Sequence, residues 1–504
     1  MIIGLGAMLA AAHAVLTRPF QAPDEPAHVN YAVSLARQGR LPVIQPGDWN
    51  PARVAQFMPL EADVSSSARA IDDMSYEDHQ PPLYYVLGWW PATWANNSWM
   101  RLACLAGPTG VVENLIVPCR AIAVMRVMRG LSVLLALLTV AVAWRALASA
   151  FPRRTDVSTG ATAFIAFLPM NAYMSGMVNN DALAQLVMAL ALLAAVRRLA
   201  GRVGRRRYAV EAGMVWGVAL LTKLTVYPAI VPLAAAEALR TRREGGRWRD
   251  AAAPAAGMAG LGLAIGAPWF ARNMAVYGLA DPFGLAAHDR VVVGQPRTVD
   301  WIAQHGWIGY LERAVVFTFD SFWGVFGWMG AFMDRRIYAV LAVASVAMTI
   351  GCAGYLRRAW RAGRDGRGGR EVRGVVGARG ADATVGDAGA VDAAAERAGD
   401  VGPLQRDAVV VLGLVVATTV AGFVWYNLSF VQHQGRYLFP ALVPIACGAM
   451  LGLREWGRWL SRAIGRPAWA DGIAAAAISA FDAGLLATSI WALARVIPTL
   501  WPAG

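Results

Sequence analysis

The sequence predicts an all-α, polytopic helical membrane protein with about eleven transmembrane helices and a long extracytoplasmic first loop that contains interfacial helices. Of the 504 residues, 57% are hydrophobic and only 16% are charged, and the mean hydropathy is +0.43. Soluble domains carry about 25% charged residues, so this composition excludes an ordinary water-soluble protein. It also excludes an intrinsically disordered chain, which combines low hydrophobicity with high net charge.

The spans are predicted from apolar runs of about 20 residues, the length that an α-helix needs to cross a bilayer. They lie near residues 1–17, 122–148, 159–178, 181–199, 208–222, 224–240, 252–271, 336–356, 408–428, 436–454 and 472–497. The first run is short, which is compatible with an incomplete N-terminus. No basic segment precedes it, which disfavours a cleaved signal peptide.

The arginines predict which loops face the cytoplasm. Four segments combine several arginines with at most two acidic residues each: 197–207, 240–250, 357–373 and 454–466. Positively charged short loops stay on the cytoplasmic side. Residues 18–119 and 272–335 contain more acidic residues than arginines and are therefore expected outside. The net charge of +13 thus reflects membrane orientation, and nucleic acid is not expected as a partner.

This orientation requires that residues 82–94 do not cross the membrane. We expect a helix there that lies in the interface, where Trp89, Trp90 and Trp94 suit the headgroup region.

The predicted organisation has three parts. These are a transmembrane core at 1–360 with outer loops 18–119 and 272–335, a disordered cytoplasmic linker at 361–405, and C-terminal transmembrane helices at 406–504. The linker is rich in Gly, Ala, Arg and Asp, and no aromatic residue lies between Trp360 and Phe423. The four cysteines form no zinc-binding motif, and Cys104 and Cys119 could be either a disulfide or two free thiols.

Ionisable groups at the outer ends of the spans are candidate functional residues, because they cost free energy unless they are paired or hydrated. Asp24 and Glu25 follow the first span, and Pro26 fits the first turn of a helix. The two carboxylates are therefore expected close to the membrane surface. Taken alone, the motif is explained equally well by capping of that helix.

A second cluster is the segment EDHQPPLYY at residues 77–85. Its two prolines force an extended entry into the next helix, so that His79 lies on a fixed loop. A lone histidine is more often structural than a ligand. Beside acidic residues, however, it could join Asp24 or Glu25 in binding a divalent cation.

Two further clusters follow. The segment Asn179-Asn180-Asp181 is expected to form a turn and the N-cap of the next helix, with substrate contact as the alternative. Lys223 is the only lysine beside 45 arginines, in a hairpin between two spans. Its ammonium group requires an anion or a hydrated cavity, unless it extends to a lipid phosphate.

The last cluster combines Arg272 with the segment His433-Gln434-Gly435-Arg436-Tyr437. Each arginine stands at the outer end of a span, and a guanidinium group can bind phosphate in a bidentate manner. Basic groups on the same side as an acidic pair favour a site that holds a phosphate beside a carboxylate.

In their order along the chain, these motifs resemble the GT-C superfamily. They are an acidic pair after the first span, HQPPLYY, an Asn-Asp turn, a Thr-Lys hairpin, WxxRN and QGRYLxP. GT-C proteins are membrane glycosyltransferases that use polyprenyl-phosphate sugars, including protein O-mannosyltransferases and the lipid A aminoarabinose transferase. The segment SFWGVFGW at 321–328 is similar to a bacterial branch of the superfamily.

The resemblance implies that Asp24 is the general base, with Glu25 as its neighbour. It implies that His79 and Gln80 line the active-site cavity and that Lys223, Arg272 and Arg436 lie near the lipid-phosphate leaving group. The clusters themselves add Tyr84, His433 and Tyr437 as further candidates for substrate binding. The family often has Lys or His directly before Pro-Pro, whereas Gln80 intervenes here. A divalent cation held by Asp24, Glu25 and His79 is an open alternative.

The implied activity is an inverting transfer of sugar from a polyprenyl-phosphate donor to a hydroxyl group of a glycan, lipid or protein acceptor. It would take place on the extracytoplasmic face of a bacterial cytoplasmic membrane. Two other classes of function remain open at this point. A transporter or flippase for lipid-linked saccharides would use the same basic groups, and a non-catalytic subunit of envelope assembly would need none of them for chemistry.

Overall fold

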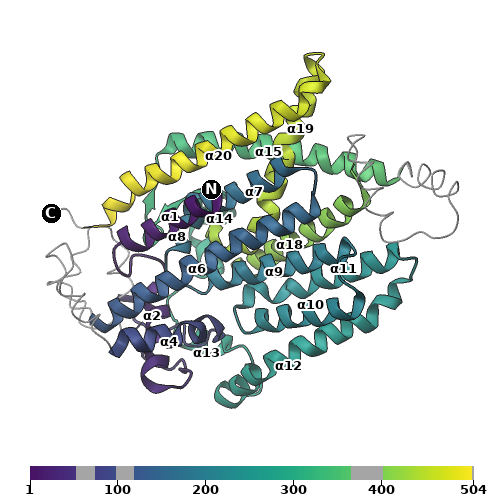
Figure 1. Ribbon diagram of the computed structural model, residues 1–504. Coiled ribbons are helices and arrows are strands. Elements are labelled where there is room, and N and C mark those ends of the chain that lie inside the picture. Colours follow the sequence, from purple (N-terminus) through teal and green to yellow (C-terminus); the bar gives the residue numbers. More distant parts are fainter. Residues whose placement is uncertain (53–73, 98–118, 365–400, 502–504) are drawn as a thin grey trace.

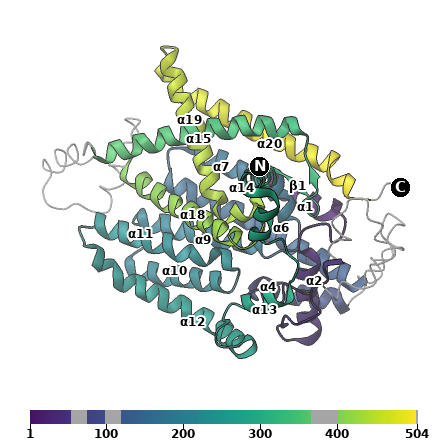
Figure 2. The same ribbon diagram turned by 180° about the vertical axis from the view of Figure 1, so that it is seen from behind.

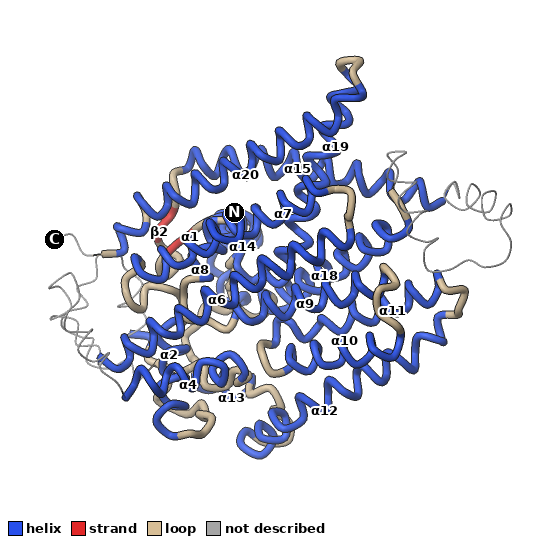
Figure 3. The backbone as a smooth tube through the Cα atoms, in the orientation of Figure 1, coloured by secondary structure: helices blue, strands red, loops and turns tan. Residues whose placement is uncertain are grey.

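The computed structural model describes residues 1–52, 74–97, 119–364 and 401–501, and within them the regular structure is almost entirely helical (Figure 3). The exception in this part of the chain is a hairpin of two short antiparallel strands, β1 (Val325–Phe326) and β2 (Ala331–Phe332). The prediction of an all-α membrane protein is confirmed.

Seven helices of the described residues are long and apolar enough to cross a membrane, fewer than the eleven predicted. They are α6 (Cys119–Ala150), α9 (Asp181–Leu199), α12 (Ala252–Tyr277), α15 (Arg335–Arg364), α18 (Pro403–Asn427), α19 (Leu442–Ala463) and α20 (Ala470–Arg495). The 3-10 turns η3 (Trp248–Ala251), η4 (Gly435–Ala441) and η5 (Pro467–Trp469) precede α12, α19 and α20, and η6 (Ile497–Leu500) follows α20.

The other four predicted spans are helical but short. They correspond to α1 (Ile2–Leu16), the pair α7 (Thr155–Phe167) and α8 (Pro169–Ser175), α10 (Arg205–Leu220), and η2 (Leu224–Ala229) with α11 (Ile230–Arg243). Pro169 ends α7 because a residue before proline avoids the helical region, and Leu168 has an extended backbone with ψ 117°. Arginines occupy the first turn of α10 and the last turn of α11, which shortens both apolar runs.

The long helices run side by side, and α9 lies inside the bundle (Figures 1 and 2). It packs against α6, α10 and α11, and most of its length is buried. In both views α15, α19 and α20 form one edge of the bundle, whereas α10, α11 and α12 form the other. Helix α9 also contacts α18 and η4, so this central helix touches both halves of the chain.

Ion pairs mark one end of this bundle. Arg198 in the last turn of α9 pairs with Glu237 of α11 at 2.6 Å, and Arg243 of α11 pairs with Asp407 of α18 at 2.6 Å. We call this the arginine-rich end, and it carries Arg198, Arg243, Arg358 and Arg454. The loops that were predicted to share one side of the membrane therefore meet at one end of the molecule.

The segments between the spans build the opposite end. They include α2 (Glu25–Gln38), α4 (Leu83–Asn97), α13 (Leu285–Val291) and α14 (Thr298–Trp323). Helix α4 lies where an interfacial helix is predicted, and it is not among the candidate spans. It exposes Trp89, Trp90 and Trp94. Its other face packs on α2 and α6.

Two sequence expectations fall outside the described residues. Most of the predicted linker, residues 365–400, lies there, although α15 extends to Arg364 and α18 begins at Pro403. The expectation for Cys104 and Cys119 also lies outside the described side chains.

Helices α15 and α19 cross with their backbones in contact. A Cβ atom on Gly452 would lie 2.1 Å from the carbonyl oxygen of Met348, and one on Gly351 would lie 2.2 Å from the carbonyl oxygen of Gly452. Small residues allow this approach between membrane helices, and Gly448 with Gly452 forms a GxxxG pair.

We predict that Gly452→Ala destabilises the protein by about 1–3 kcal/mol, because the added methyl group has no space at the crossing. The measurement is thermal unfolding of the purified protein in detergent. Gly448→Ala is the matched control, since its Cβ would meet only Cys352 Sγ, at 3.4 Å. Equal melting temperatures for the two variants would contradict the crossing geometry.

Candidate functional site

Four charged side chains from distant parts of the sequence meet at the end of the bundle opposite the arginine-rich end. Arg436 Nη2 donates to Asp24 Oδ2 at 2.7 Å, and Arg436 Nη1 lies 4.0 Å from Asp181 Oδ2. Lys223 Nζ donates to Asp181 Oδ1 at 2.5 Å. We call Asp24, Asp181, Lys223 and Arg436 the Asp24 cluster.

Asp24 is held in an unusual backbone conformation. It precedes α2 with φ 65° and ψ −3°, in the left-handed region that non-glycine residues rarely adopt, although Asp tolerates it better than most. The hydroxyl of Tyr76 donates to Asp24 Oδ1 at 3.1 Å. Backbone strain of this kind concentrates at functional positions.

The loop that carries Asp24 is attached through its main chain. Trp328 Nε1 donates to the carbonyl oxygen of Phe20 at 2.9 Å. The hydroxyl of Tyr173 donates to the carbonyl oxygen of Gln21 at 2.8 Å. Trp328 belongs to the SFWGVFGW segment and follows β1. This segment therefore supports the loop before Asp24.

The other members of the cluster stand at helix boundaries. Asp181 is the first residue of α9, and Lys223 follows the end of α10. The N-cap residue of α9 is Asn180, but its side chain makes no capping hydrogen bond. Asn179 instead accepts the backbone N–H of Ala182 through Oδ1 at 3.2 Å. The carboxylate of Asp181 is therefore not used for capping and pairs with Lys223 and Arg436.

The electrostatics keep Asp24 ionised. Burial raises the pKa of Asp24, but the charge and hydrogen bond of Arg436, with smaller contributions from His28 and Tyr76, bring it below its ordinary value. The Arg436 side chain is only 3% exposed, whereas that of Asp24 is 29% exposed. Two carboxylates face two cations, so the four side chains are balanced in charge. The carboxylate of Asp24 keeps partial access to solvent.

A third carboxyl group, that of Glu77, lies beside the cluster. Glu77 Oε2 is buried without a hydrogen-bond partner among the described residues. Burial raises the pKa of Glu77, against the opposing effects of His28 and Lys223. Nearby, His28 Nδ1 and the hydroxyl of Tyr85 lie 2.6 Å apart. Glu77 is therefore a carboxyl group that could exchange a proton close to Asp24.

The loop at 77–85 reaches the cluster through Gln80. Asn180 Nδ2 donates to Gln80 Oε1 at 3.1 Å, which links this loop to the turn before Asp181. His79 contacts the cluster only indirectly: its Nδ1 donates to the carbonyl oxygen of Tyr76 at 3.1 Å, and its Nε2 lies 3.5 Å from Gln80 Nε2. Its ring lies 4.5 Å from the ring of His288.

Glu25 has a different environment from Asp24. It is fully buried and forms a bidentate pair with Arg129, at 2.8 and 2.7 Å. Arg129 also donates to the carbonyl oxygens of Ala14, Thr17 and Arg18. Glu25 Oε1 accepts the backbone N–H of Val178 at 3.1 Å. Glu25 therefore joins four segments and is not presented to a substrate.

Several predicted site residues lie elsewhere. Arg272 donates to the carbonyl oxygens of Leu41 and Pro42 and packs over Trp269 and Tyr277. The hydroxyl groups of Tyr84 and Ser132 lie 2.8 Å apart between α4 and α6.

Two predicted residues flank Arg436 in sequence. The ring of His433 packs against Tyr310, and its nitrogens have no hydrogen-bond partner among the described residues. The ring of Tyr437 lies beside the guanidinium group of Arg436, 5.3 Å from ring centre to Cζ. Tyr437 is thus the one of this pair that adjoins the cluster.

The residues expected to hold a divalent cation do not converge. Glu25 binds Arg129, Asp24 binds Arg436, and His79 binds a backbone carbonyl. Within the described ranges, no group of three or more His, Cys, Asp or Glu side chains could hold a metal ion.

Asp181, Glu77 and Tyr76 were not selected as site residues from the sequence. Asp181 was assigned to a turn and Glu77 to an acidic run, and both assignments fit the local sequence. A useful signal was present for Asp181, because a buried lysine requires an anion and Asp181 stands at the same end of neighbouring helices as Lys223.

Comparisons with known proteins give one family and one fold likeness. The family model described as "Predicted membrane protein (DUF2142)" matches residues 7–366. Among curated proteins, none matches the chain significantly. Two crystal structures of ArnT from Cupriavidus metallidurans are similar. The structure bound to undecaprenyl phosphate has 14% identity and a TM-score of 0.45, with 99% of this chain and 73% of that chain covered. The apo structure has 16% identity and a TM-score of 0.45, with 99% and 72% covered.

We predict that Arg129→Met destabilises the protein by about 3–5 kcal/mol, because it leaves the Glu25 carboxylate buried without its partner. The double variant Glu25→Leu with Arg129→Met should lose less stability than the single variant, since no lone charge remains. Chemical denaturation in detergent measures both. Additive losses in the double variant would show that the pair does not act as a unit.

We further predict a pH dependence of stability to which His79 contributes. Burial lowers the pKa of His79 to about 4 and that of His288 to about 3, from 6.5. The unfolded chain therefore binds protons that the folded chain cannot, so stability present above pH 6.5 is lost as the pH falls towards 4.

His79→Gln should reduce this loss, measured as the melting temperature over that pH range. Substitution of the exposed His305 by Gln is the control and should leave the pH dependence unchanged. An unaltered slope in His79→Gln would refute the assignment.

Proposed function

The chain belongs to the DUF2142 family of predicted membrane proteins, and from this premise we propose that it is a membrane glycosyltransferase. The donor is a polyprenyl-phosphate sugar, the acceptor is a hydroxyl group, and transfer occurs with inversion on the extracytoplasmic face. The observation that carries the proposal is the Asp24 cluster. In it, two carboxylates lie within hydrogen-bond or ion-pair distance of two cations of the kind that bind phosphate, Lys223 and Arg436. The order of motifs that resembles the GT-C superfamily supports it.

Arg436 and Lys223 would bind the donor phosphate. Both are partly or fully withdrawn from water, where charge interactions are stronger than in bulk solvent. As the bond from the anomeric carbon to the phosphate oxygen breaks, negative charge develops on the leaving polyprenyl phosphate. Two fixed cations would stabilise that charge. Asp181 contacts both and would hold them in position.

Asp24 would accept the acceptor proton. The acceptor oxygen forms a bond to the anomeric carbon while its proton moves to the carboxylate, and such assistance contributes about 10²–10⁴-fold. In the free protein Asp24 is bound to Arg436. A phosphate that binds Arg436 would compete for this guanidinium group and so would release Asp24 to act as a base when the donor is present.

We predict that Asp24→Asn lowers sugar transfer by about 10²–10⁴-fold, because the amide cannot accept the proton. Asn tolerates the left-handed backbone at this position, so the fold should persist. The assay supplies membranes with labelled polyprenyl-phosphate sugar and measures product. Asp300→Asn, at an exposed carboxylate on α14, should transfer as the wild type does.

Equal transfer by Asp24→Asn and wild type would remove Asp24 from the mechanism. Glu77→Gln should have a smaller effect than Asp24→Asn, and the reverse order would identify Glu77 as the base. Movement of the lipid across the membrane without a new glycosidic bond would replace the enzyme proposal with a transporter.

A further inference from the structure

One face of helix α14 is apolar and exposed, although α14 is not among the seven candidate spans of the described residues. Between the kink at Gly306 and the end of the helix, five apolar side chains are each at least 52% exposed: Trp307, Ile308, Leu311, Val315 and Val316. Ile308, Leu311 and Val315 have the spacing of a single helix face. A contiguous exposed apolar face marks contact with a membrane or with another protein.

The opposite face of α14 packs on the segment that carries Arg436. The hydroxyl of Thr318 donates to the carbonyl oxygen of His433 at 3.2 Å, and the backbone N–H of Gly435 donates to Ser321 Oγ at 2.8 Å. A Cβ atom on Gly435 would collide with the carbonyl oxygen of Thr318. The exposed apolar face is therefore the side of α14 that points away from the bundle.

The C-terminal end of α14 reaches the interior of the bundle. The ring centre of Trp323 lies 5.7 Å from that of Phe164 on α7 and 6.4 Å from that of Phe481 on α20. Trp323 is itself buried. Helix α14 therefore ends between two helices of the transmembrane bundle.

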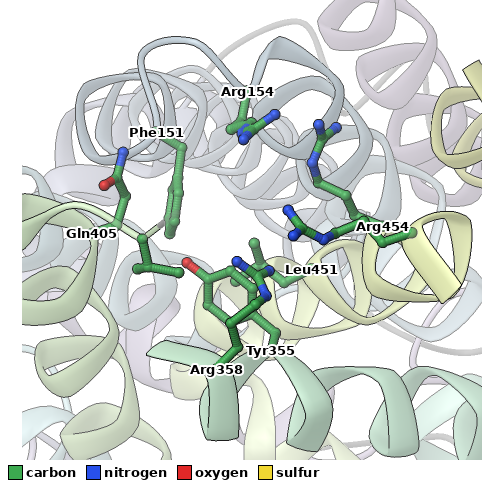
Figure 4. Close-up of a pocket in the computed structure, with 9 residues that line it drawn as sticks. Phe151, Arg154, Tyr355, Arg358, Gln405, Leu451 and Arg454 are labelled. Atoms are coloured by element: carbon green, nitrogen blue, oxygen red, sulfur yellow. The ribbon is translucent and has the colours of Figure 1, made fainter. Parts of the chain in front are cut away.

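Both of these helices begin at the arginine-rich end. Arg454 pairs there with Asp156 in the first turn of α7 and with Asp471 in the first turn of α20. Figure 4 shows Arg454 at this end, with Arg154 and Tyr355 around the same space. The two ion pairs give a common level from which the depth of Trp323 can be measured.

Trp323 lies near the middle of the bilayer. Phe164 follows Asp156 by eight positions, and Phe481 follows Asp471 by ten. At about 1.5 Å per residue, the two phenylalanines lie about 12–15 Å from the arginine-rich end. This distance is roughly half the thickness of a bilayer core, which is about 30 Å.

After Trp323 the chain returns to the outer side. The hairpin of β1 and β2 follows α14, and Trp328 in its turn donates Nε1 to the carbonyl oxygen of Phe20, in the loop before Asp24. Val325 and Phe326 of β1 are buried. Non-helical backbone at membrane depth requires such burial within protein. Helix α14 and the hairpin therefore enter and leave on the same side.

The depth of Trp323 limits how far out the exposed face can lie. At about 1.5 Å per residue, Val315 is at most about 12 Å further out than Trp323, so it is within roughly 27 Å of the arginine-rich end and inside the hydrocarbon core. Leu311 is at most about 18 Å further out than Trp323, near the boundary of the core. Glu312 interrupts the face at this boundary, from which its carboxylate can reach the headgroups. Trp307 lies further out still, at the level that tryptophan favours.

We propose that α14 is a re-entrant helix whose exposed face, residues 307–316, binds the acyl chains of the outer leaflet. The occupant is lipid rather than a protein domain, because Val315 lies at the depth of the hydrocarbon core. Since the opposite face of α14 holds Gly435, this lipid contact also fixes the residue before Arg436. The proposal does not depend on the glycosyltransferase activity.

The test measures the depth of α14 in a bilayer. Val315→Cys and Ile308→Cys are made in the full chain, labelled with a nitroxide and placed in phosphatidylcholine vesicles. Electron paramagnetic resonance then gives the collision rates of the label with oxygen, which concentrates in hydrocarbon, and with a nickel chelate, which stays in water. The labelled wild type gives the signal of the native cysteines, which is subtracted.

We expect the ratio of oxygen to nickel collisions to be several-fold higher at position 315 than at position 300, with position 308 between them. Asp300→Cys is the matched control, because Asp300 is exposed on the same helix before its kink. Val343→Cys, at an exposed position within the span α15, gives the value of a side chain that faces lipid.

Ratios at positions 315 and 308 equal to that at position 300 would place α14 in water and overturn the proposal. A higher ratio at 308 than at 315 would reverse the direction of insertion and would also overturn it. Spin–spin broadening at 315 that is lost on dilution with unlabelled protein would assign the face to a second copy of the chain instead of lipid. If Val315→Cys does not fold, Val316→Cys on the same face gives the same comparison.

Discussion

The buried ion pair between Glu25 and Arg129 is the interaction on which the candidate site depends. Arg129 closes the end of α1 by binding three backbone carbonyls, and Glu25 binds the backbone of Val178 in the turn before α9. Asp24 is the next residue to Glu25, and Asp181 follows Val178 by three positions. A single pair on α6 and α2 therefore sets the positions of both carboxylates that meet Arg436. Because neither charge could be buried alone, this geometry is kept as a unit.

The adjacent residues Asp24 and Glu25 consequently have different roles in the structure. Glu25 is the first residue of α2 and faces the protein interior, whereas Asp24, in its left-handed conformation, points to Arg436 and Tyr76. The change of backbone direction between them separates a structural carboxylate from a solvent-accessible one. In the free cluster each cation already has a carboxylate, Asp181 for Lys223 and Asp24 for Arg436. Under the proposed mechanism, an incoming phosphate exchanges with Asp24 rather than entering an empty cationic site.

The sequence was sufficient for the helical class, for the positions of the seven long apolar helices and for which ends of the helices share a side. Four further predicted spans coincide with helices that are shorter than these seven, because Pro169 divides one of them and α1, α10 and α11 have 15, 16 and 14 residues. Of the residues predicted for the site, Asp24, Lys223 and Arg436 lie together in the Asp24 cluster, and Gln80 contacts the turn before Asp181. The sequence could not decide between Arg436 and Arg272, because the direction of each side chain depends on neighbouring backbone, as the contacts of Arg272 with Leu41 and Pro42 show. The pairing of Glu25 with Arg129, 104 positions away, has no local signal at all.

The supports of the Asp24 loop engage main-chain carbonyl oxygens at Phe20 and Gln21, not their side chains. Substitutions at these two positions therefore leave both bonds available, provided that the new residue accepts the local backbone. A deletion or insertion between Leu16 and Asp24 would instead shift the carbonyl groups out of register with Trp328 and Tyr173. These two bonds therefore constrain the length of the segment more directly than its composition, although Phe20 and Gln21 are themselves buried.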